Sequence, residues 1–171
     1  MTPPGEGKDA DHAAANFKWD VFLLAGNPAK PEEGSNYNPG TTVNGWFAAP
    51  DNIAFDPQGR MWIATDGATD FDIADGLYAT ETDGAGRALT RMFFACPTGA
   101  EVCGPCFTPD GKTLFVAVQH PATDNTKDWP EFGKSSSFED PATRWPDFKD
   151  DMPPRPSVVV ITKEDGGVIG V

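Results

Sequence analysis

The sequence predicts an all-β protein, an incomplete β-propeller of about two to three blades of antiparallel strands with a long irregular insertion. Three observations lead to this fold class. The 171 residues include 18 glycines and 17 prolines, which favour short strands and many turns. No long window shows the periodicity of an amphipathic helix. Finally, a stretch that begins at Phe55 recurs at Phe107, as repeated blades require.

We divide the chain into a polar N-terminal segment, residues 1–16, and predicted propeller blades, residues 17–171. The first predicted strand is FKWDVFLLA, residues 17–25, which is followed by a Gly-Asn-Pro turn. A polar stretch without periodicity, residues 28–43, is predicted to be a loop. The apolar run MWIAT, residues 61–65, is the second predicted strand.

The later strands are predicted from apolar runs bounded by turn residues. An Asp-Gly-Ala-Gly turn indicates a hairpin between the third and fourth strands, and a Pro-Asp-Gly turn precedes the fifth. The last two strands are expected to form a hairpin around Lys-Glu-Asp-Gly-Gly. The predicted ranges are, in order, residues 76–82, 88–95, 112–119, 158–162 and 168–171.

The repeat aligns FDPQGRMWIATD with FTPDGKTLFVAVQ, with one residue inserted in the second turn. Both copies read Phe-x-Pro-x-Gly-basic, then an apolar strand, then a polar residue. Asp66 and Gln119 are the equivalent polar ends, about 53 positions apart, a spacing typical of propeller blades. A β-sandwich is the alternative that the strand pattern leaves open.

A long segment, residues 121–156, separates the second repeat from the last strands. It is rich in proline and acids and contains Trp129 and Trp145. Such a segment is too long for a connection between strands. We interpret it as an insertion that packs over one face, in the manner of a lid. The alternative is a partly disordered surface loop.

The charge of the chain excludes some classes of partner. The 26 acidic residues outnumber the 13 basic ones, for a net charge of −13. Such a surface repels nucleic acids and anionic membranes, although acid-rich loops bind hard cations such as calcium. No apolar run is long enough to span a membrane, and the N-terminus lacks the apolar core of a signal peptide. That start is typical of a loop cut from a longer protein.

The three cysteines, Cys96, Cys103 and Cys106, lie in one short stretch. The last two have redox or zinc spacing, but no second cysteine pair exists and the chain has only two histidines. We therefore expect buried small residues or one local disulfide rather than a zinc site.

Polar residues at the ends of the predicted central strands are candidate metal ligands. Carboxylate and amide oxygens suit calcium or a hard ferric ion, and an acid such as Glu101 amid small and apolar residues needs a partner if it is buried. Some candidates also have a structural alternative. Asp51 and Asn52 would form an Asx turn and Asp66 an Asp-Gly turn. His120 would be a hydrogen-bonded histidine at the edge of a strand. No nucleophile motif or phosphate-binding loop is present. The candidates are Asp51, Asn52, Asp66, Glu101, Gln119 and His120.

These stretches resemble a known family. The segments PDNIAFDPQGRMWIATDG, GAEVCGPCFTPDGKTLFVAVQHP and PRPSVVVITKEDGGVIGV are similar to the C-terminal part of the PhoX family of secreted alkaline phosphatases. FKWDVFLLAGNP fits the strand that precedes them in that family. The resemblance covers nearly the whole chain apart from the first dozen residues and the insertion.

The resemblance implies a propeller enzyme that carries ferric and calcium ions, hydrolyses phosphate monoesters and works in the periplasm or outside the cell after twin-arginine export. It implies that Glu101 and the Asp51-Asn52 pair bind metal, with Asp66 and Gln119 in support. His120 would line the channel and contact substrate or a ligand. The cation would neutralise phosphoryl oxygens and generate or position the nucleophile.

The sequence departs from the family pattern in several places. Cys103 stands where the family usually has threonine, and Ala122-Thr123 follows His-Pro where glycine and an acid are usual. The family's iron-binding cysteine, with an arginine and a glutamate of its site, lies upstream of the regions matched here. Cys96, Cys103 and Cys106 do not match that cysteine.

We therefore hypothesise a C-terminal fragment of a phosphatase that is inactive without its missing N-terminal half. The alternative is a non-enzymatic calcium-binding β-repeat module or a lactonase-like propeller fragment. Because a propeller fragment leaves blade faces unpaired, self-association is also expected.

Overall fold

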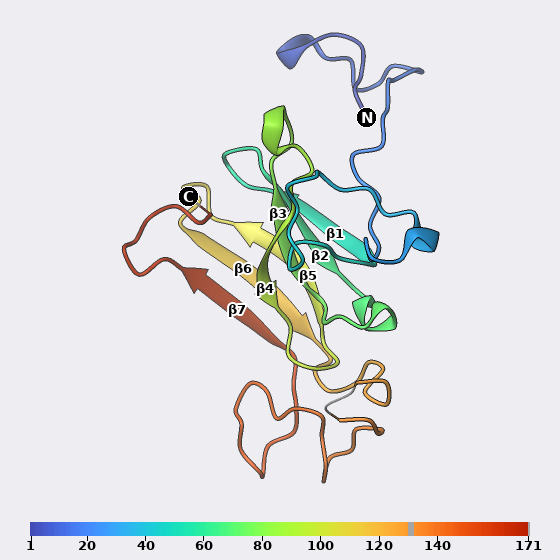
Figure 1. The fold of residues 1–171 in the computed structure, drawn as a ribbon. Coiled ribbons are helices and arrows are strands. Elements are labelled where there is room, and N and C mark those ends of the chain that lie inside the picture. Colours follow the sequence, from blue (N-terminus) through green and yellow to red (C-terminus); the bar gives the residue numbers. More distant parts are fainter. Residues whose placement is uncertain (130–131, 171) are drawn as a thin grey trace.

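The computed structural model describes residues 1–129 and 132–170 of an all-β chain (Figure 1). Two antiparallel sheets form its centre, one with four strands and one with three. The first sheet has the order β1-β2-β3-β4. Its strands are β1 (Pro50–Phe55), β2 (Met61–Thr65), β3 (Gly76–Thr80) and β4 (Arg91–Ala95).

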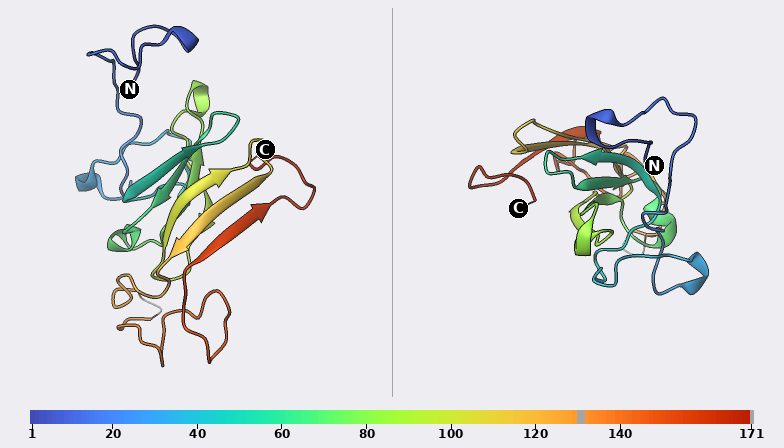
Figure 2. Two further views of the ribbon diagram at one scale, coloured as in Figure 1. Left: turned by 180° about the vertical axis from the view of Figure 1, so that it is seen from behind. Right: turned by 90° about the horizontal axis from the view of Figure 1, so that it is seen from above.

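The second sheet has the order β5-β6-β7, with β6 in the middle. Its strands are β5 (Glu101–Phe107), β6 (Thr113–Gln119) and β7 (Ser157–Thr162). The helices of the described residues are all short 3₁₀ turns: η1 (Gly7–Asp9), η2 (Pro31–Glu33), η3 (Ala68–Phe71) and η4 (Gly84–Gly86). The N-terminal segment and the insertion lie beyond opposite ends of the sheets (Figure 2).

The main apolar core lies between the two sheets. Trp62 and Leu77 of the first sheet pack with Val102, Leu114 and Val116 of the second. All five side chains are essentially inaccessible to solvent. Alternate residues of β6 face this core, as the period of a half-buried strand requires. The core therefore holds the first sheet against the second, with β2 beside β5.

The other face of the first sheet is covered by the chain that precedes β1. Phe47, Ile63 and Tyr78 form a second buried cluster, which Tyr37 joins from the side. The Tyr37 hydroxyl donates to the Phe47 carbonyl at 2.5 Å and accepts from the Gly26 amide at 3.2 Å. Gly26, Tyr37 and Phe47, all ahead of β1 in the sequence, thus help to close the outer face of the first sheet.

The sequence repeat is visible in the strands. β1 and β5 begin the two halves, and each has an irregular register, between Pro50 and Ile53 in β1 and between Cys103 and Cys106 in β5. The two irregular stretches contact each other, since the Gly104 amide donates to Oδ1 of Asn52 at 3.1 Å. A β-bulge of this kind bends a strand and redirects its side chains. The matching bulges join the two sheets near one end.

Most predicted strands are confirmed with small changes in their bounds. β2 has the predicted range, and β6 and β7 differ from theirs by one residue at the start. β3 and β4 pair around η4 as the Asp-Gly-Ala-Gly turn indicates. The all-β class is confirmed, and the count of two sheets agrees with two blades. The propeller arrangement itself stays a prediction.

Two predicted strands are wrong. Residues 17–25 form no strand, because their backbone finds only isolated bridges, at Lys18 and Leu24, and no continuous partner. The predicted last strand, residues 168–171, is also absent over its described part. Ile169 turns inward instead, and its amide donates to the Gly111 carbonyl at 2.9 Å. Residue 171 lies outside the described residues.

β1 and β5 are strands that the sequence patterns did not indicate. Asp51, Asn52 and Glu101 therefore lie within strands rather than ahead of them. The polar residues of these segments hid the strand pattern. Their pairing with β2 and β6 supplies the order that their own composition does not.

The described part of the insertion contains no strand and lies beyond the end of β6 (Figure 1). Trp145 packs against the main core. The three cysteines are free thiols, Cys96 buried and Cys106 exposed. The outer face of the second sheet exposes Val158 and Val160, and the expected self-association stays a prediction.

A buried ion pair closes the turn before β2. Asp56 accepts from Nε of Arg60 at 2.6 Å and from the Trp62 indole at 2.8 Å. Arg60 also donates to the carbonyls of Ile169 and Gly170. Although burial opposes it, the hydrogen bonds from Trp62 and Arg60 hold the pKa of Asp56 below its ordinary value. The pair thus ties the repeat turn to the last described residues.

We expect Asp56→Ala to lower the free energy of unfolding by about 3–5 kcal/mol, because it leaves the buried Arg60 guanidinium without a negative charge to balance it. Urea denaturation at pH 7 measures this. Since the folded-state pKa of Asp56 lies below the unfolded one, its contribution is lost as the pH falls through the folded value. Asp110→Ala in the second repeat turn, where the acid is exposed, is the control. An equal loss in both variants would contradict the assignment.

Candidate functional site

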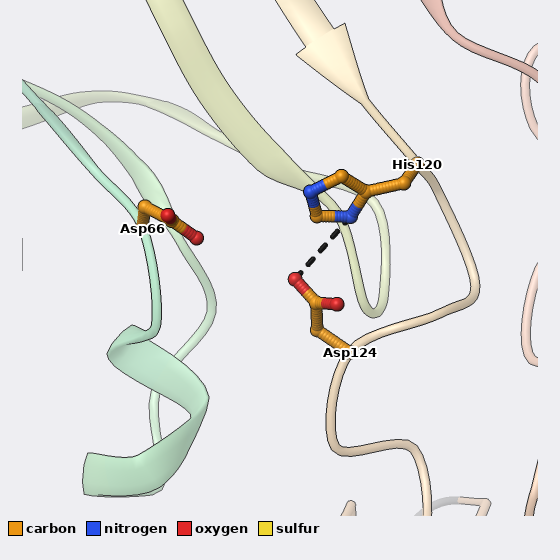
Figure 3. A group of neighbouring side chains, drawn as sticks. All are labelled: Asp66, His120 and Asp124. Atoms are coloured by element: carbon orange, nitrogen blue, oxygen red, sulfur yellow. Dashed lines mark ion pairs between the residues drawn. The ribbon is translucent and has the colours of Figure 1, made fainter.

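The ends of β2 and β6 bring three ligand-type side chains together (Figure 3). Asp66 directly follows β2, and His120 directly follows β6. Asp124 lies in the turn after His120. One potential ligand atom of each of the three lies within 4.8 Å of the others. Nδ1 of His120 is 3.3 Å from Oδ2 of Asp124. The group therefore joins the polar ends of the two repeats.

A buried carboxylate positions Asp66. Oδ1 of Asp75 accepts from the Thr65 hydroxyl at 2.6 Å and from the Ala68 amide at 3.0 Å. Its Oδ2 accepts from the Gly67 amide at 3.1 Å. Asp75 is only 1% exposed, so these bonds replace its lost hydration. They fix the backbone on both sides of Asp66, whose carboxylate stays exposed to solvent.

The turn that carries His120 and Asp124 is held by the backbone before β5. The carbonyl of Gly99 accepts from the amides of Thr123 and Asp124, each at 3.1 Å. The Thr98 carbonyl accepts from the next amide upstream, at 2.8 Å. A Cβ on Gly99 would lie 3.0 Å from the Thr123 nitrogen, and its φ of 67° also favours glycine. Gly99 thus permits the close approach that places the turn.

Glu101 links the start of β5 to the histidine. Oε2 of Glu101 accepts a hydrogen bond from the side-chain amide of Gln119 at 2.6 Å and lies 3.2 Å from Nε2 of His120. Glu101 is 6% exposed and Gln119 is its register partner across β5 and β6. With Nε2 of His120 engaged by Glu101, the opposite ring nitrogen faces Asp124.

Two of these acids are electrostatically strained. Burial, followed by the charges of Asp75, Asp124 and Asp51, raises the pKa of Asp66. Burial and the charge of Asp66 also raise the pKa of Glu101, although His120 and Gln119 partly oppose this. A raised carboxyl pKa means that nearby positive charge does not balance the ionised form. A bound cation would supply that balance.

The structure brings together most of the predicted site residues. Asp66, His120, Glu101 and Gln119 lie in one connected cluster. Asp51 is close enough for its charge to raise the pKa of Asp66, and it accepts from the Asn52 amide at 2.7 Å. The side-chain oxygen of Asn52, Oδ1, already accepts a hydrogen bond from the Gly104 amide of the second sheet. Asn52 therefore lies beside the cluster as a contact between the bulges.

Two residues of this candidate site were not predicted. Asp124 is the acid that the family pattern leads one to seek after His-Pro, displaced by Ala122 and Thr123. That signal was present in the sequence. Asp75 has no such signal, because its importance comes from burial against a turn that only the folded chain creates.

The comparisons with known proteins give the family of the chain. A family profile described as alkaline phosphatase PhoX matches residues 6–122, more than half of the chain. The chain belongs to the PhoX alkaline phosphatase family. It is also similar to the solved structure of Pseudomonas fluorescens PhoX in complex with vanadate, a transition state analogue, with 35% sequence identity and a TM-score of 0.71.

The alignment with the Pseudomonas PhoX structure covers 94% of this chain and 26% of the other. The chain therefore spans about a quarter of the length of that relative. A search of the curated proteins found no match. Within the described residues, no helix has the length and apolar character that crossing a membrane requires.

The side chains at the site fit the cations implied by the PhoX family. Carboxylates suit both calcium and ferric iron, and an imidazole suits iron better than calcium. Asp66 and Asp124 supply carboxylates, and His120 supplies the imidazole. The contact between Glu101 and the far ring nitrogen is the carboxylate–histidine arrangement common at metal centres.

We expect Asp66→Asn to raise the stability of the metal-free chain at pH 7 by up to about 0.5 kcal/mol. The folded-state pKa of Asp66 exceeds the unfolded one, so its ionisation lowers stability as the pH rises through the folded value. Thermal unfolding in chelator measures the gain, which should vanish below the ordinary aspartate pKa.

The control is Asp83→Asn, which removes one acid at an exposed turn far along the sequence from the site. It tests whether any loss of negative charge from this acidic chain gives the same effect. A gain of equal size in both variants would show that net charge, and not the local cluster, causes it.

Proposed function

We propose that the chain provides the C-terminal part of a metal-dependent alkaline phosphatase that hydrolyses phosphate monoesters with iron and calcium. The observation that carries the proposal is the convergence of Asp66, His120 and Asp124 from the ends of two repeats. Membership of the PhoX family supports the reaction class. The likeness to a relative solved with vanadate, a transition state analogue, supports phosphoryl transfer. By the same resemblance, the whole protein works in the periplasm or outside the cell.

Each residue has a distinct role in this proposal. A cation would be held by Asp66, Asp124 and His120. Glu101 would orient the ring of His120 by accepting a hydrogen bond from its Nε2–H. Gln119 donates to the same Glu101 oxygen and so restrains that carboxylate. Asp51 adds negative charge beside the cation site. When bound, the cation would neutralise phosphoryl oxygens and lower the pKa of bound water.

Asp75 and Gly99 would act through the backbone. Asp75 fixes the residues on both sides of Asp66, and Gly99 fixes the turn of His120 and Asp124. A displacement of about 1 Å at a reacting centre can reduce rates about a hundredfold. Their rigidity therefore contributes directly to the chemistry proposed for the exposed groups.

We expect the 171-residue chain to bind calcium but to show no phosphatase turnover alone, because the remaining ligands belong to an upstream part. Calorimetric titration should show binding that Asp124→Asn weakens at least about tenfold, because it removes a carboxylate ligand and even the loss of an outer-shell partner typically costs about 10- to 100-fold. Asp83→Asn should leave the affinity unchanged. Saturation at about 100 times Kd should stabilise the wild-type chain by about 2.7 kcal/mol.

The reaction is tested with p-nitrophenyl phosphate, using this chain and the same chain joined to the upstream part of its reading frame. We expect metal-dependent turnover only from the joined protein, and its loss in Asp66→Asn. Turnover by the 171-residue chain alone would contradict its incompleteness. Calcium binding without turnover in the joined protein would favour the non-enzymatic calcium-binding module or the lactonase-like propeller.

A further inference from the structure

A polar pocket of about 560 Å³ opens in the insertion, next to the turn that carries His120 and Asp124. Its volume lies in the range of small-molecule sites, roughly 300–1,000 Å³. The function proposed above does not use it. The residues of its wall that matter here are Thr123, Thr126, Lys127, Asp128, Ser135 and Ser136.

The pocket shares a wall with the candidate cation site. Thr123 belongs to the pocket wall, and its hydroxyl lies 3.0 Å from Nδ1 of His120 and 3.1 Å from Oδ1 of Asp124. On the other side, the Asn125 side chain donates to the Thr69 hydroxyl at 3.1 Å, which ties the pocket to the loop after Asp66. The pocket and the candidate cation site are therefore adjacent, with Thr123 between them.

The lining offers several hydroxyl protons. The Thr126 oxygen accepts from the Ser136 amide at 3.2 Å, and the Ser136 oxygen accepts from the Ala142 amide at 3.1 Å. A hydroxyl whose oxygen accepts a bond still has its own proton to donate. Lys127 adds an ammonium donor, and Asp128 adds an acceptor. This mixture of donors with an acceptor is complementary to a ligand that carries several hydroxyl groups.

The same lining does not suit an aromatic ligand. Among the described residues of the pocket wall, none is aromatic. A phenyl group or a nucleobase gains affinity by stacking on aromatic or broad apolar surfaces, which this wall does not provide. Each hydroxyl of a polyol, in contrast, can exchange its bonds with water for bonds with the wall.

We propose that this pocket binds the polyhydroxylated alcohol part of a phosphate monoester whose phosphoryl group lies at Asp66, His120 and Asp124. The proposal rests on the proposed phosphatase function for the position of the phosphoryl group. The insertion thereby selects sugar and polyol phosphates over aryl phosphates. Thr123, at the boundary of the two sites, contacts the reacting end, and Lys127 and Ser135 contact the alcohol.

The test is a titration of the ¹⁵N-labelled chain in calcium, followed by amide NMR. The ligands are methyl phosphate, glucose 6-phosphate, phenyl phosphate and free glucose. We expect glucose 6-phosphate to bind about tenfold more tightly than methyl phosphate, as two or three additional hydrogen bonds allow. Its shifts should include residues 135–137, and phenyl phosphate should bind no more tightly than methyl phosphate.

Two variants test the wall without removing any contact described in the fold. Lys127→Met and Ser135→Ala should each reduce the advantage of glucose 6-phosphate by about threefold and leave methyl phosphate affinity unchanged. Lys149→Met is the matched control, because it removes an exposed lysine from the same insertion outside the pocket wall. It should leave both affinities unchanged.

The outcomes separate the two proposals. If methyl phosphate changes amide chemical shifts but glucose 6-phosphate binds no more tightly, the polyol-binding proposal is wrong and the phosphatase proposal stands. If free glucose changes the amide chemical shifts of residues 135–137 and methyl phosphate changes none, the result supports the polyol site and counts against the phosphatase proposal. Phenyl phosphate binding as tightly as glucose 6-phosphate would overturn the selectivity.

Discussion

The apolar contact between the two sheets is the constraint on which the rest of the structure depends. Trp62 and Leu77 meet Val102, Leu114 and Val116 across it, with essentially no solvent access. Each large side chain buried in this way contributes roughly 1.5–3 kcal/mol. Because the strands are rigid, this contact also determines how the ends of the strands lie relative to one another. The cluster around His120 thus gets its geometry from residues that take no part in any chemistry.

The sequence predicted elements well where the pattern is local and poorly where a partner decides. β2 and the turn before β4 carry their own signals, whereas β1 and β5 are strands only because β2 and β6 pair with them. The converse error is FKWDVFLLA, which alternates like a strand but has no ladder partner. Asp66 and Gln119 were selected from the repeat. Asp75 was not, since its role arises from burial.

Three acidic sites show how environment assigns different tasks to one chemical group. Asp56 has a guanidinium and an indole as partners, and its pKa is lowered. Asp75 is buried and fully engaged by a hydroxyl and two amides. Asp66 has neighbouring acids instead, and its pKa is raised. The first two stabilise the fold, whereas the third lies exposed among like charges at a candidate site, a conflict common at functional positions.

The insertion leaves β6 and returns at β7, and these strands pair directly through Val118 and Ser157. The sheet register is therefore set by the strands themselves and does not depend on the length of chain between them. Because the entropic cost of closing a loop rises only logarithmically with its length, this junction tolerates lengthening and shortening. The segment between β6 and β7 can therefore change in length and sequence while the two sheets keep their pairing.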